Sequence, residues 1–292
     1  MKIRKAVIPV AGKGTRLLPA TKNIPKEMIP IINKPMIHYA VSEAVNAGIE
    51  QVIFITSGGK ESIENYFDRN IDLEVFLEKN NKHEELELVR KIGSMIDVVS
   101  IRQKEQLGLG HAIACAKDVI GDEIFAVLLG DDLVWGENPV IKQLMEVSQK
   151  HKMKSVIGVM EVPNAETFRY GIVDGKFIDD KTLLMKNMIE KPRPEDAPTN
   201  LATPGRYILT PQIFDCLERI PRGHGGEYQL TDAICMLAKE DEVYAHIFEG
   251  DRFDTGNVES YLNATVEFAL RTPGVRPIME KIIREKMSKY KL

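Results

Sequence analysis

Short apolar runs alternate with helical patterns through the first half of the chain, and this alternation limits its possible folds more than any other feature. The runs are residues 6–10, 52–55, 98–101 and 125–129. Helical patterns begin near Pro35 and Lys60, and Gly48 marks the predicted end of the first. Apolar strands that alternate with helices are typical of a parallel sheet covered on both faces. We therefore predict an α/β fold whose ligands bind beyond the carboxyl ends of the strands.

The pattern changes after Ser155. Shorter β-like segments predict a mixed or antiparallel extension at residues 156–162, 170–178 and 183–190. Helical patterns occupy residues 140–147, 211–218, 228–239, 257–270 and 277–291. Asn138 and Pro139 predict the start of the first of these helices, with Asn138 as its N-cap. The lysine-rich tail, residues 271–292, and the side chain of Lys60 are expected to be solvated surface.

Composition excludes several classes of protein. With 43% hydrophobic and 28% charged residues, the 292-residue chain is neither disordered nor fibrous. No apolar stretch approaches the roughly eighteen residues of a membrane span, and residues 6–10 are too short for a signal sequence. We therefore expect a cytoplasmic protein without a membrane partner. Cys115, Cys216 and Cys235 form no CxxC pair, so neither a disulfide framework nor a zinc cluster is predicted.

Positive charge is concentrated at the N-terminus. Residues 1–34 contain eight lysines and arginines but only one acid, Glu27, whereas the whole chain has a net charge of −4. The remainder is therefore strongly acidic, which argues against nucleic acid as a partner. The basic residues are interleaved with apolar ones such as Leu17 and Ile29, so they suit a folded, anion-facing segment better than a disordered arm.

A glycine loop, AGKGTR over residues 11–16, directly follows the first predicted strand. Gly12 and Gly14 would allow positive φ and turn successive N–H groups toward an anion, and Arg16 could neutralise phosphates. The loop lacks the GxxxxGK(S/T) spacing of a Walker A motif, and Leu17 stands where the dinucleotide motif needs a third glycine. A polyphosphate site is favoured, and a strand-to-helix turn with solvated charges is the alternative.

Three prolines, Pro19, Pro25 and Pro30, follow the loop. They predict an extended, stiff segment that holds Lys26 and Glu27 in place. Lys26 would then join Arg16 in neutralising the phosphates.

Carboxylates follow the predicted strand at 125–129 and precede the predicted helix at 257–270. Asp131 lies just beyond that strand, beside the expected phosphate site, and oxygen ligands of this kind suit Mg²⁺. Asp254 is the candidate second ligand, although an acidic residue before a helix can equally be an N-cap. Asp132 is expected either to support Asp131 or to cap a helix.

Gln103 lies just past the strand at 98–101, and Gly108 and His111 follow it. A side-chain amide presents both a donor and an acceptor, as the edge of a base requires. From the residues alone a solvent-facing Gln103 is favoured, and His111 is expected to be structural.

The extension offers a second group of candidates. Gly171 lies inside a β pattern, where a glycine often marks close approach of a ligand. Glu190 and Lys191 end the next β segment. A glutamate can accept hydrogen bonds from two hydroxyls, and a lysine supplies a mobile charge for a phosphate. The alternative is an exposed turn.

Taken together, these motifs resemble a known family. The segment AGKGTRLLPATKNIPKEMIP resembles the signature of bacterial UTP–glucose-1-phosphate uridylyltransferases, in the sugar nucleotidyltransferase superfamily. Thymidylyltransferases share the GxGTRL core but differ across the proline-rich part. The resemblance continues in the family's order through RQKEQLGLGHA, LLGDD, YGIV, IEKP, GRYILTP, GGEYQLTDAI and FDTG, and spans roughly residues 4–270.

The resemblance implies a Rossmann-like, mostly parallel mixed sheet flanked by helices, with a smaller β-rich sugar-binding extension and a C-terminal helix. Residues 1–270 would form one domain, with a nucleotide-binding part to about residue 150 and a sugar-binding part over about 151–256. It assigns nucleotide contacts to Ala11, Gly12, Gly14, Thr15, Glu27, Gln103 and Gly108. It assigns binding of the hexose and its phosphate to Gly171, Glu190 and Lys191. It assigns catalysis to Arg16, Lys26 and Lys191. The metal ligands that it implies are Asp131 and Asp254.

The implied reaction transfers the uridylyl group of UTP to glucose 1-phosphate with Mg²⁺ as cofactor, and the implied assembly is a homodimer or homotetramer. One alternative is a thymidylyltransferase or another sugar-1-phosphate nucleotidyltransferase. A second, of a different class, is a non-catalytic sensor of nucleotide sugars. Such a sensor should have lost metal or lysine ligands, whereas Lys26, Asp131, Lys191 and Asp254 are all present.

Overall fold

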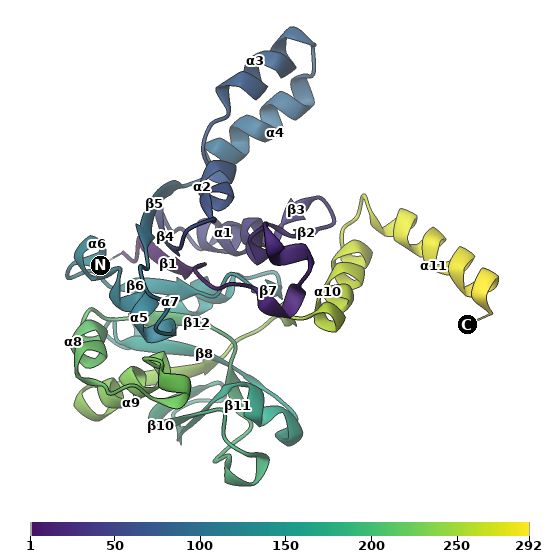
Figure 1. The fold of residues 1–292 in the computed structure, drawn as a ribbon. Coiled ribbons are helices and arrows are strands. Elements are labelled where there is room, and N and C mark those ends of the chain that lie inside the picture. Colours follow the sequence, from purple (N-terminus) through teal and green to yellow (C-terminus); the bar gives the residue numbers. More distant parts are fainter. Residues whose placement is uncertain (1, 292) are drawn as a thin grey trace.

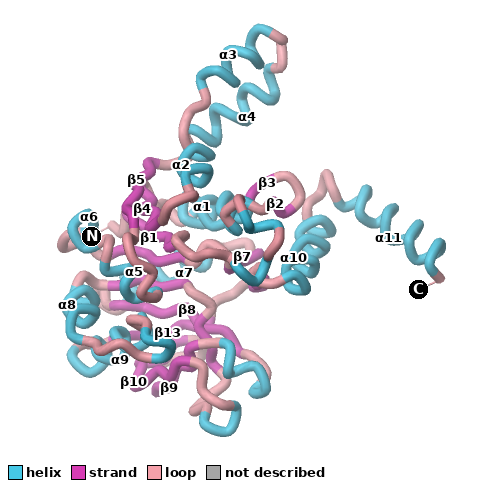
Figure 2. The backbone as a smooth tube through the Cα atoms, viewed as in Figure 1, coloured by secondary structure: helices cyan, strands magenta, loops and turns pink. Residues whose placement is uncertain are grey.

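One ten-stranded mixed β-sheet organises the structure, a computed structural model that describes residues 2–291 (Figure 1, Figure 2). The strand order is β11-β9-β10-β13-β8-β12-β6-β1-β4-β5. The bounds are β1 Lys5–Pro9, β4 Gln51–Thr56, β5 Asp97–Arg102, β6 Phe125–Leu128, β8 Ser155–Glu161, β9 Gly171–Phe177, β10 Thr182–Glu190, β11 Leu201–Thr203, β12 Arg206–Leu209 and β13 Val243–Ile247. Two small ribbons pair β2 Pro30–Ile31 with β3 Lys34–Pro35, and β7 Asp132–Trp135 with β14 Asp251–Asp254.

Strands β5, β4, β1 and β6 form a run of four parallel strands, and β8 and β13 form a second parallel pair. The run of four strands corresponds to the four predicted apolar runs, and the predicted α/β fold is confirmed. Strand β5 differs from the other three because it lies at the edge of the sheet and is only half-buried. Antiparallel pairing begins where β12 joins β6 to β8, in the part of the chain for which the sequence predicted it.

Helices cover both faces of the sheet (Figure 2). Their bounds are α1 Met36–Asn46, α2 Glu61–Phe67, α3 Ile71–Lys79, α4 His83–Gly93, α5 Leu109–Ala114, α6 Lys117–Ile120, α7 Val140–Lys150, α8 Gln212–Arg219, α9 Leu230–Glu240, α10 Val258–Arg271 and α11 Arg276–Tyr290. Val7 and Phe125 pack with α5, α8 and α9 on one face, and Ile8 and Phe54 pack with α1, α2 and α7 on the other. Successive side chains of a strand point to opposite faces, so both faces become core.

Helices α3 and α4 form a hairpin that projects from the body of the molecule (Figure 1). This hairpin was not predicted from the sequence. The helical period is weak in α3, whereas α4 has a clear amphipathic pattern that was overlooked. Among the apolar residues of the two helices, only Leu77 and Leu86 are buried. Helix α11 also extends away from the body, and none of its residues is buried. Among residues 2–291, no helix has the length and apolar content to cross a membrane.

The proline-rich segment is not extended, so that prediction is wrong. It forms two 3₁₀ turns, Ala20–Lys22 and Lys26–Met28, directly preceded by Pro19 and Pro25. The fixed φ of proline suits a residue that leads into a tight turn as well as it suits an extended one. The segment still brings Lys26 to the carboxyl edge of the sheet.

Asn138 is not the N-cap of α7, and this prediction is also wrong. Pro139 occupies the N-cap position, where no side chain accepts a capping hydrogen bond. The N–H of Ile141 instead donates to a carboxylate oxygen of Glu43, on α1, at 3.3 Å. A distant residue therefore satisfies a donor that local sequence rules assign to a neighbour.

Candidate active site

The glycine loop leaves β1 at the carboxyl edge of the parallel strands. Gly14 has φ +65° directly before the 3₁₀ turn Thr15–Leu17, and a Cβ there would lie 3.0 Å from Cβ of Lys26. A glycine is therefore required at this position. A Cβ on Gly12 would meet no atom within 4 Å, so the backbone at Gly12 borders open space. Positive φ was predicted at both glycines, and it occurs at Gly14 but not at Gly12.

An open cleft of about 670 Å³ lies beside the loop, and Gly12 and Lys60 are among the residues that line it. The carbonyl of Ala11 accepts hydrogen bonds from Ser57 Oγ at 3.0 Å and from Gln106 Nε2 at 2.6 Å. These contacts join the loop to the ends of β4 and β5. The cleft is therefore bounded by the ends of three adjacent parallel strands, where ligands bind in open α/β sheets.

Gln103 is buried at the end of β5, so the expectation of a solvent-facing side chain is wrong. Its Nε2 lies 2.9 Å from Nδ1 of His111 and 3.3 Å from the carbonyl oxygen of Gly108, to which it donates. Gly108 has φ +102°, and a Cβ there would approach the carbonyl oxygen of Tyr228 to 2.9 Å. Gly108 is thus required by backbone packing, and His111 contacts the side-chain amide of Gln103.

Lys60 is buried, so its assignment to the solvated surface is wrong. Its Nζ donates to Oε2 of Glu27 at 2.7 Å, and both side chains are almost fully inaccessible. Burial raises the pKa of Glu27 despite the opposing charges of Lys60 and Lys26. Oε1 of Glu27 has no hydrogen-bond partner. A buried carboxylate oxygen therefore lacks the partner that such atoms usually have.

Lys26 and Asp131 form an ion pair with a distance of 2.5 Å between Nζ and Oδ2. Burial opposes the charged forms of both groups. The charges of Asp131 and Glu27 outweigh burial at Lys26 and hold its pKa above its usual value. The charges of Lys26 and, to a smaller extent, Arg16 likewise outweigh burial at Asp131 and hold its pKa below its usual value. The pair is therefore ionised at neutral pH.

The two candidate metal ligands are joined through Thr255. Its N–H and Oγ1 donate to the carbonyl oxygen of Asp131 at 3.1 Å and 2.6 Å. The preceding residue, Asp254, lies at the end of β14, and its Oδ2 accepts from Nη2 of Arg169 at 3.0 Å. Among the side chains that the structure describes, no group of three His, Cys, Asp or Glu residues is suited to enclose a metal ion. Two carboxylates facing a phosphate site nevertheless fit Mg²⁺, which takes its remaining ligands from substrate phosphates and water.

Asp132 opens strand β7 and caps no helix. Its carboxylate pairs with Arg252 on β14, with 2.6 Å between Nε and Oδ1, and Nη1 of Arg252 donates to the hydroxyl of Tyr170 at 2.9 Å. Burial raises the pKa of Asp132 to about 6, although Arg252 opposes the shift. The N-cap alternative for Asp132 is therefore wrong, and its contacts tie the residue next to Asp131 to β14.

Gly171, Glu190 and Lys191 lie together where β9 and β10 pair. A Cβ on Gly171 would meet the methyl group of Met188 and lie 3.3 Å from Oε2 of Glu190, so a larger residue would displace the Met188 side chain and narrow the space beside Glu190. Glu190 accepts a hydrogen bond from Thr231 Oγ1 at 2.6 Å. Lys191 has φ +47°, and its half-exposed Nζ lies 3.3 Å from Oε1 of Glu190. Its charge is thus held loosely and can turn to a ligand.

A cavity of about 460 Å³ joins the two groups of candidates, with Arg16, Asp131, Gly171, Glu190, Lys191 and Asp254 in its lining. Arg169, Arg252 and Thr231 line it as well, and the sequence did not single them out. Arg169 directly precedes the YGIV motif and Thr231 belongs to GGEYQLTDAI, so their place in quoted motifs was the available signal. Lys60 lies in none of the quoted motifs, so the sequence offered no such signal for it.

The match to a family model is as extensive as the motifs suggested. Residues 5–270 match the model of the nucleotidyl transferase family. The chain belongs to this family. It is similar to a UTP–glucose-1-phosphate uridylyltransferase of Bacillus subtilis, with 49% identity over 288 residues that cover 97% of this chain and 98% of the relative.

Solved structures of family members are similar to this chain along almost its whole length. A UTP-bound UGPase from Acinetobacter baumannii matches with a TM-score of 0.89 and 42% identity, covering 97% of this chain and 99% of that one. A UDP-glucose pyrophosphorylase complexed with UDP-glucose matches with a TM-score of 0.84 and 42% identity, covering 91% and 98%. The family resemblance and the fold class predicted from the sequence are both confirmed.

The buried Glu27–Lys60 pair gives a prediction about stability. Lys60→Met should lower the free energy of unfolding by about 3–5 kcal/mol, because it leaves a buried carboxylate without its partner. Adding Glu27→Gln should restore much of the loss. Urea denaturation followed by circular dichroism measures both changes.

Lys117→Met is the control, because Lys117 pairs with Glu218 on the exposed surface. It should change the stability little. If Lys60→Met lowers the free energy of unfolding no more than Lys117→Met does, the buried ion pair does not stabilise the fold as described.

Proposed function

We propose that the chain transfers the uridylyl group of UTP to α-D-glucose 1-phosphate, forming UDP-glucose and pyrophosphate. One observation carries the proposal: a single cavity collects Arg16 from the glycine loop, the carboxylates of Asp131 and Asp254, and the Glu190–Lys191 pair. Phosphate-binding cations and hydroxyl-binding carboxylates thus face the same space. The names of the similar proteins, a uridylyltransferase and structures with UTP or UDP-glucose, support the same substrates.

The chemistry needs no protein nucleophile, because the phosphate of glucose 1-phosphate is ionised at neutral pH. One of its oxygens forms a bond to the α-phosphorus of UTP, and the bond from that phosphorus to the bridging oxygen breaks as pyrophosphate leaves with the electron pair. Arg16 and Lys26 neutralise the triphosphate, and Lys191 orients the attacking phosphate. Alignment and charge neutralisation account for the rate enhancement.

Asp131 and Asp254 are the residues that would hold Mg²⁺. The ion would supply further neutralisation of the phosphate charge. Lys26 and Arg169, which now lie against these carboxylates, would then be free to contact phosphate oxygens.

For the nucleoside we propose Gln103 as the residue that binds the base, supported by Gly108, the backbone at Ala11 and Gly12, and Glu27. The burial of Gln103 and the unpartnered Oε1 of Glu27 support this assignment, because both can present a fixed polar atom to a ligand. Thr15 and Gly14 belong to the phosphate-binding loop.

A homodimer or homotetramer and a cytoplasmic location complete the proposal. Ile278 and Ile282 are exposed one turn apart on α11, and a second copy of the chain would cover them.

A panel of nucleoside triphosphates and sugar 1-phosphates tests the proposed function. The activity, measured as pyrophosphate release, should be highest with UTP and glucose 1-phosphate. Equal or faster turnover with dTTP would favour the thymidylyltransferase alternative. Binding of UDP-glucose without turnover of any pair would favour the sensor.

The role of Lys191 gives a separate prediction. Lys191→Ala should lower kcat by about 10²–10³-fold, because the attacking phosphate loses its orienting charge. The affinity for UTP, measured by calorimetry, should be unchanged.

Lys186→Ala is the matched control, because Lys186 lies exposed on the same strand, β10. It should leave both quantities unchanged. An equal loss of turnover and of UTP binding in Lys191→Ala would contradict the assigned role.

A further inference from the structure

Arg206 is fully buried, although an arginine is rarely found inside a protein without partners. It belongs to the motif GRYILTP, which the proposed reaction does not use, and it opens β12 beside β6. Its guanidinium carries five N–H donors. The acceptors of these donors indicate what the residue holds in place.

Every N–H of this guanidinium has an acceptor. Nε donates to both carboxylate oxygens of Glu43, at 3.1 Å and 3.0 Å, and Nη2 donates to Oε2 of Glu43 at 2.9 Å. The other donors reach backbone carbonyl oxygens. Nη1 lies 3.1 Å from that of Leu129 and 3.3 Å from that of Gly205, and Nη2 lies 2.5 Å from that of Asp132.

Two of these carbonyls flank the candidate metal ligand. Leu129 and Asp132 lie on either side of Gly130 and Asp131, so one planar group holds the turn at both ends. The carbonyl of Asp131 itself accepts from Thr255 on the other side. The turn is therefore fixed from its protein side, whereas the carboxylate of Asp131 faces the cavity.

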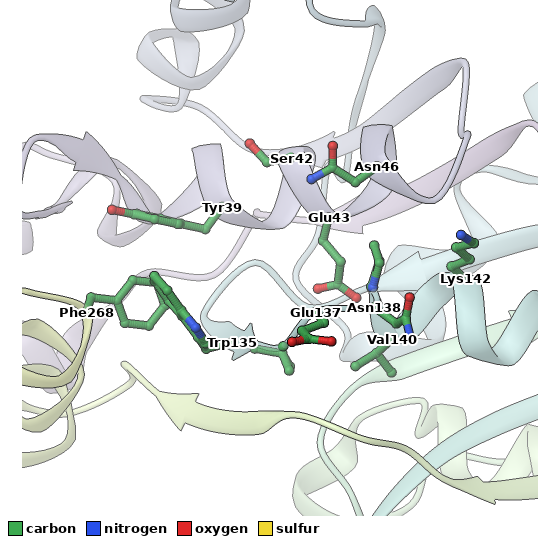
Figure 3. A pocket seen from close by; sticks show the side chains of 13 residues that line it. Tyr39, Ser42, Glu43, Asn46, Trp135, Glu137, Asn138, Val140, Lys142 and Phe268 are labelled. Atoms are coloured by element: carbon green, nitrogen blue, oxygen red, sulfur yellow. The ribbon is translucent and has the colours of Figure 1, made fainter. Parts of the chain in front are cut away.

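Glu43 holds the guanidinium in turn. Its side chain projects from α1 into a pocket between α1 and residues 134–140, close to Asn138 and Val140 (Figure 3). It also accepts the N–H of Ile141 at the start of α7. The carboxylate thus ties Arg206 to two helices, and the pair compensates a charge that could not remain buried alone.

We propose that Arg206, held by Glu43, is a positioning residue that sets the place of Asp131 for metal and triphosphate. The inference rests on the proposed function only in taking Asp131 as a metal ligand. A lysine cannot replace the guanidinium, because its single ammonium group cannot span Glu43 and two carbonyls of the turn. Residues behind a metal ligand change metal affinity or activity by about 10–100-fold when they are altered.

The test compares Arg206→Lys and Glu43→Gln with wild type. Binding of Mn²⁺ in the presence of UTP is measured by electron paramagnetic resonance, and kcat and KM are measured with Mg²⁺. We expect Mn²⁺ affinity to fall by about 10–100-fold in Arg206→Lys, with a smaller loss in Glu43→Gln. The affinity for UTP without metal should stay within about twofold, because Asp131 does not hold the nucleotide directly.

Glu74→Gln is the control for loss of a buried carboxylate. Glu74 is 3% exposed and pairs with Arg69 and Arg90 in the α3–α4 hairpin. This variant should lower thermal stability without changing Mn²⁺ affinity. If Arg206 had only a structural role, Arg206→Lys and Glu43→Gln would behave like Glu74→Gln, with lower thermal stability and unchanged Mn²⁺ affinity.

Mn²⁺ affinity within about twofold of wild type in folded Arg206→Lys would overturn the proposal. If Arg206→Lys does not fold, the same result in Glu43→Gln overturns it. A different result would contradict the proposed function: wild type would bind Mn²⁺ and UTP but form no UDP-glucose. In that case the Mn²⁺ measurement still decides the role of Arg206.

Discussion

The free-energy cost of burying an ionised side chain shapes the carboxyl edge of this sheet. A carboxylate or ammonium group removed from water loses several kcal/mol of hydration, and it stays charged only beside an opposite charge. Glu27 with Lys60, and Asp131 with Lys26, meet this condition as pairs that join segments far apart in the sequence. The charges that a triphosphate would contact therefore also hold the loops of the site in place.

The same pairing explains how a site so rich in charge can exist before its substrates arrive. Asp131 and Asp254 each lie against a cation of the chain, Lys26 and Arg169. In the proposed function these cations would turn from carboxylate to phosphate oxygens when substrate and metal bind, before the chemical step, and the metal would then compensate the carboxylates. Little reorganisation is then required during the reaction, which is the condition under which fixed charges stabilise a transition state best.

Much of this arrangement could be predicted from the sequence, because strands and glycine loops leave local signals. The apolar runs identified the parallel strands, and Gly14 stands where positive φ is required. Lys60 could not be placed, because its burial depends on Glu27, which is distant in the sequence. The α3–α4 hairpin was missed for a different reason. The period is weak only in α3, and the amphipathic pattern of α4 was a usable signal in the sequence.

In the proposed reaction the phosphate of glucose 1-phosphate attacks the α-phosphorus of UTP directly, and the chain supplies position and charge but no nucleophile. The most direct measurement uses one diastereomer of UTP with sulfur on the α-phosphorus and determines the configuration of the UDP-glucose product by phosphorus NMR. A single in-line displacement predicts inversion at that phosphorus. Retention of configuration would require two successive displacements through a uridylylated residue and would contradict the account.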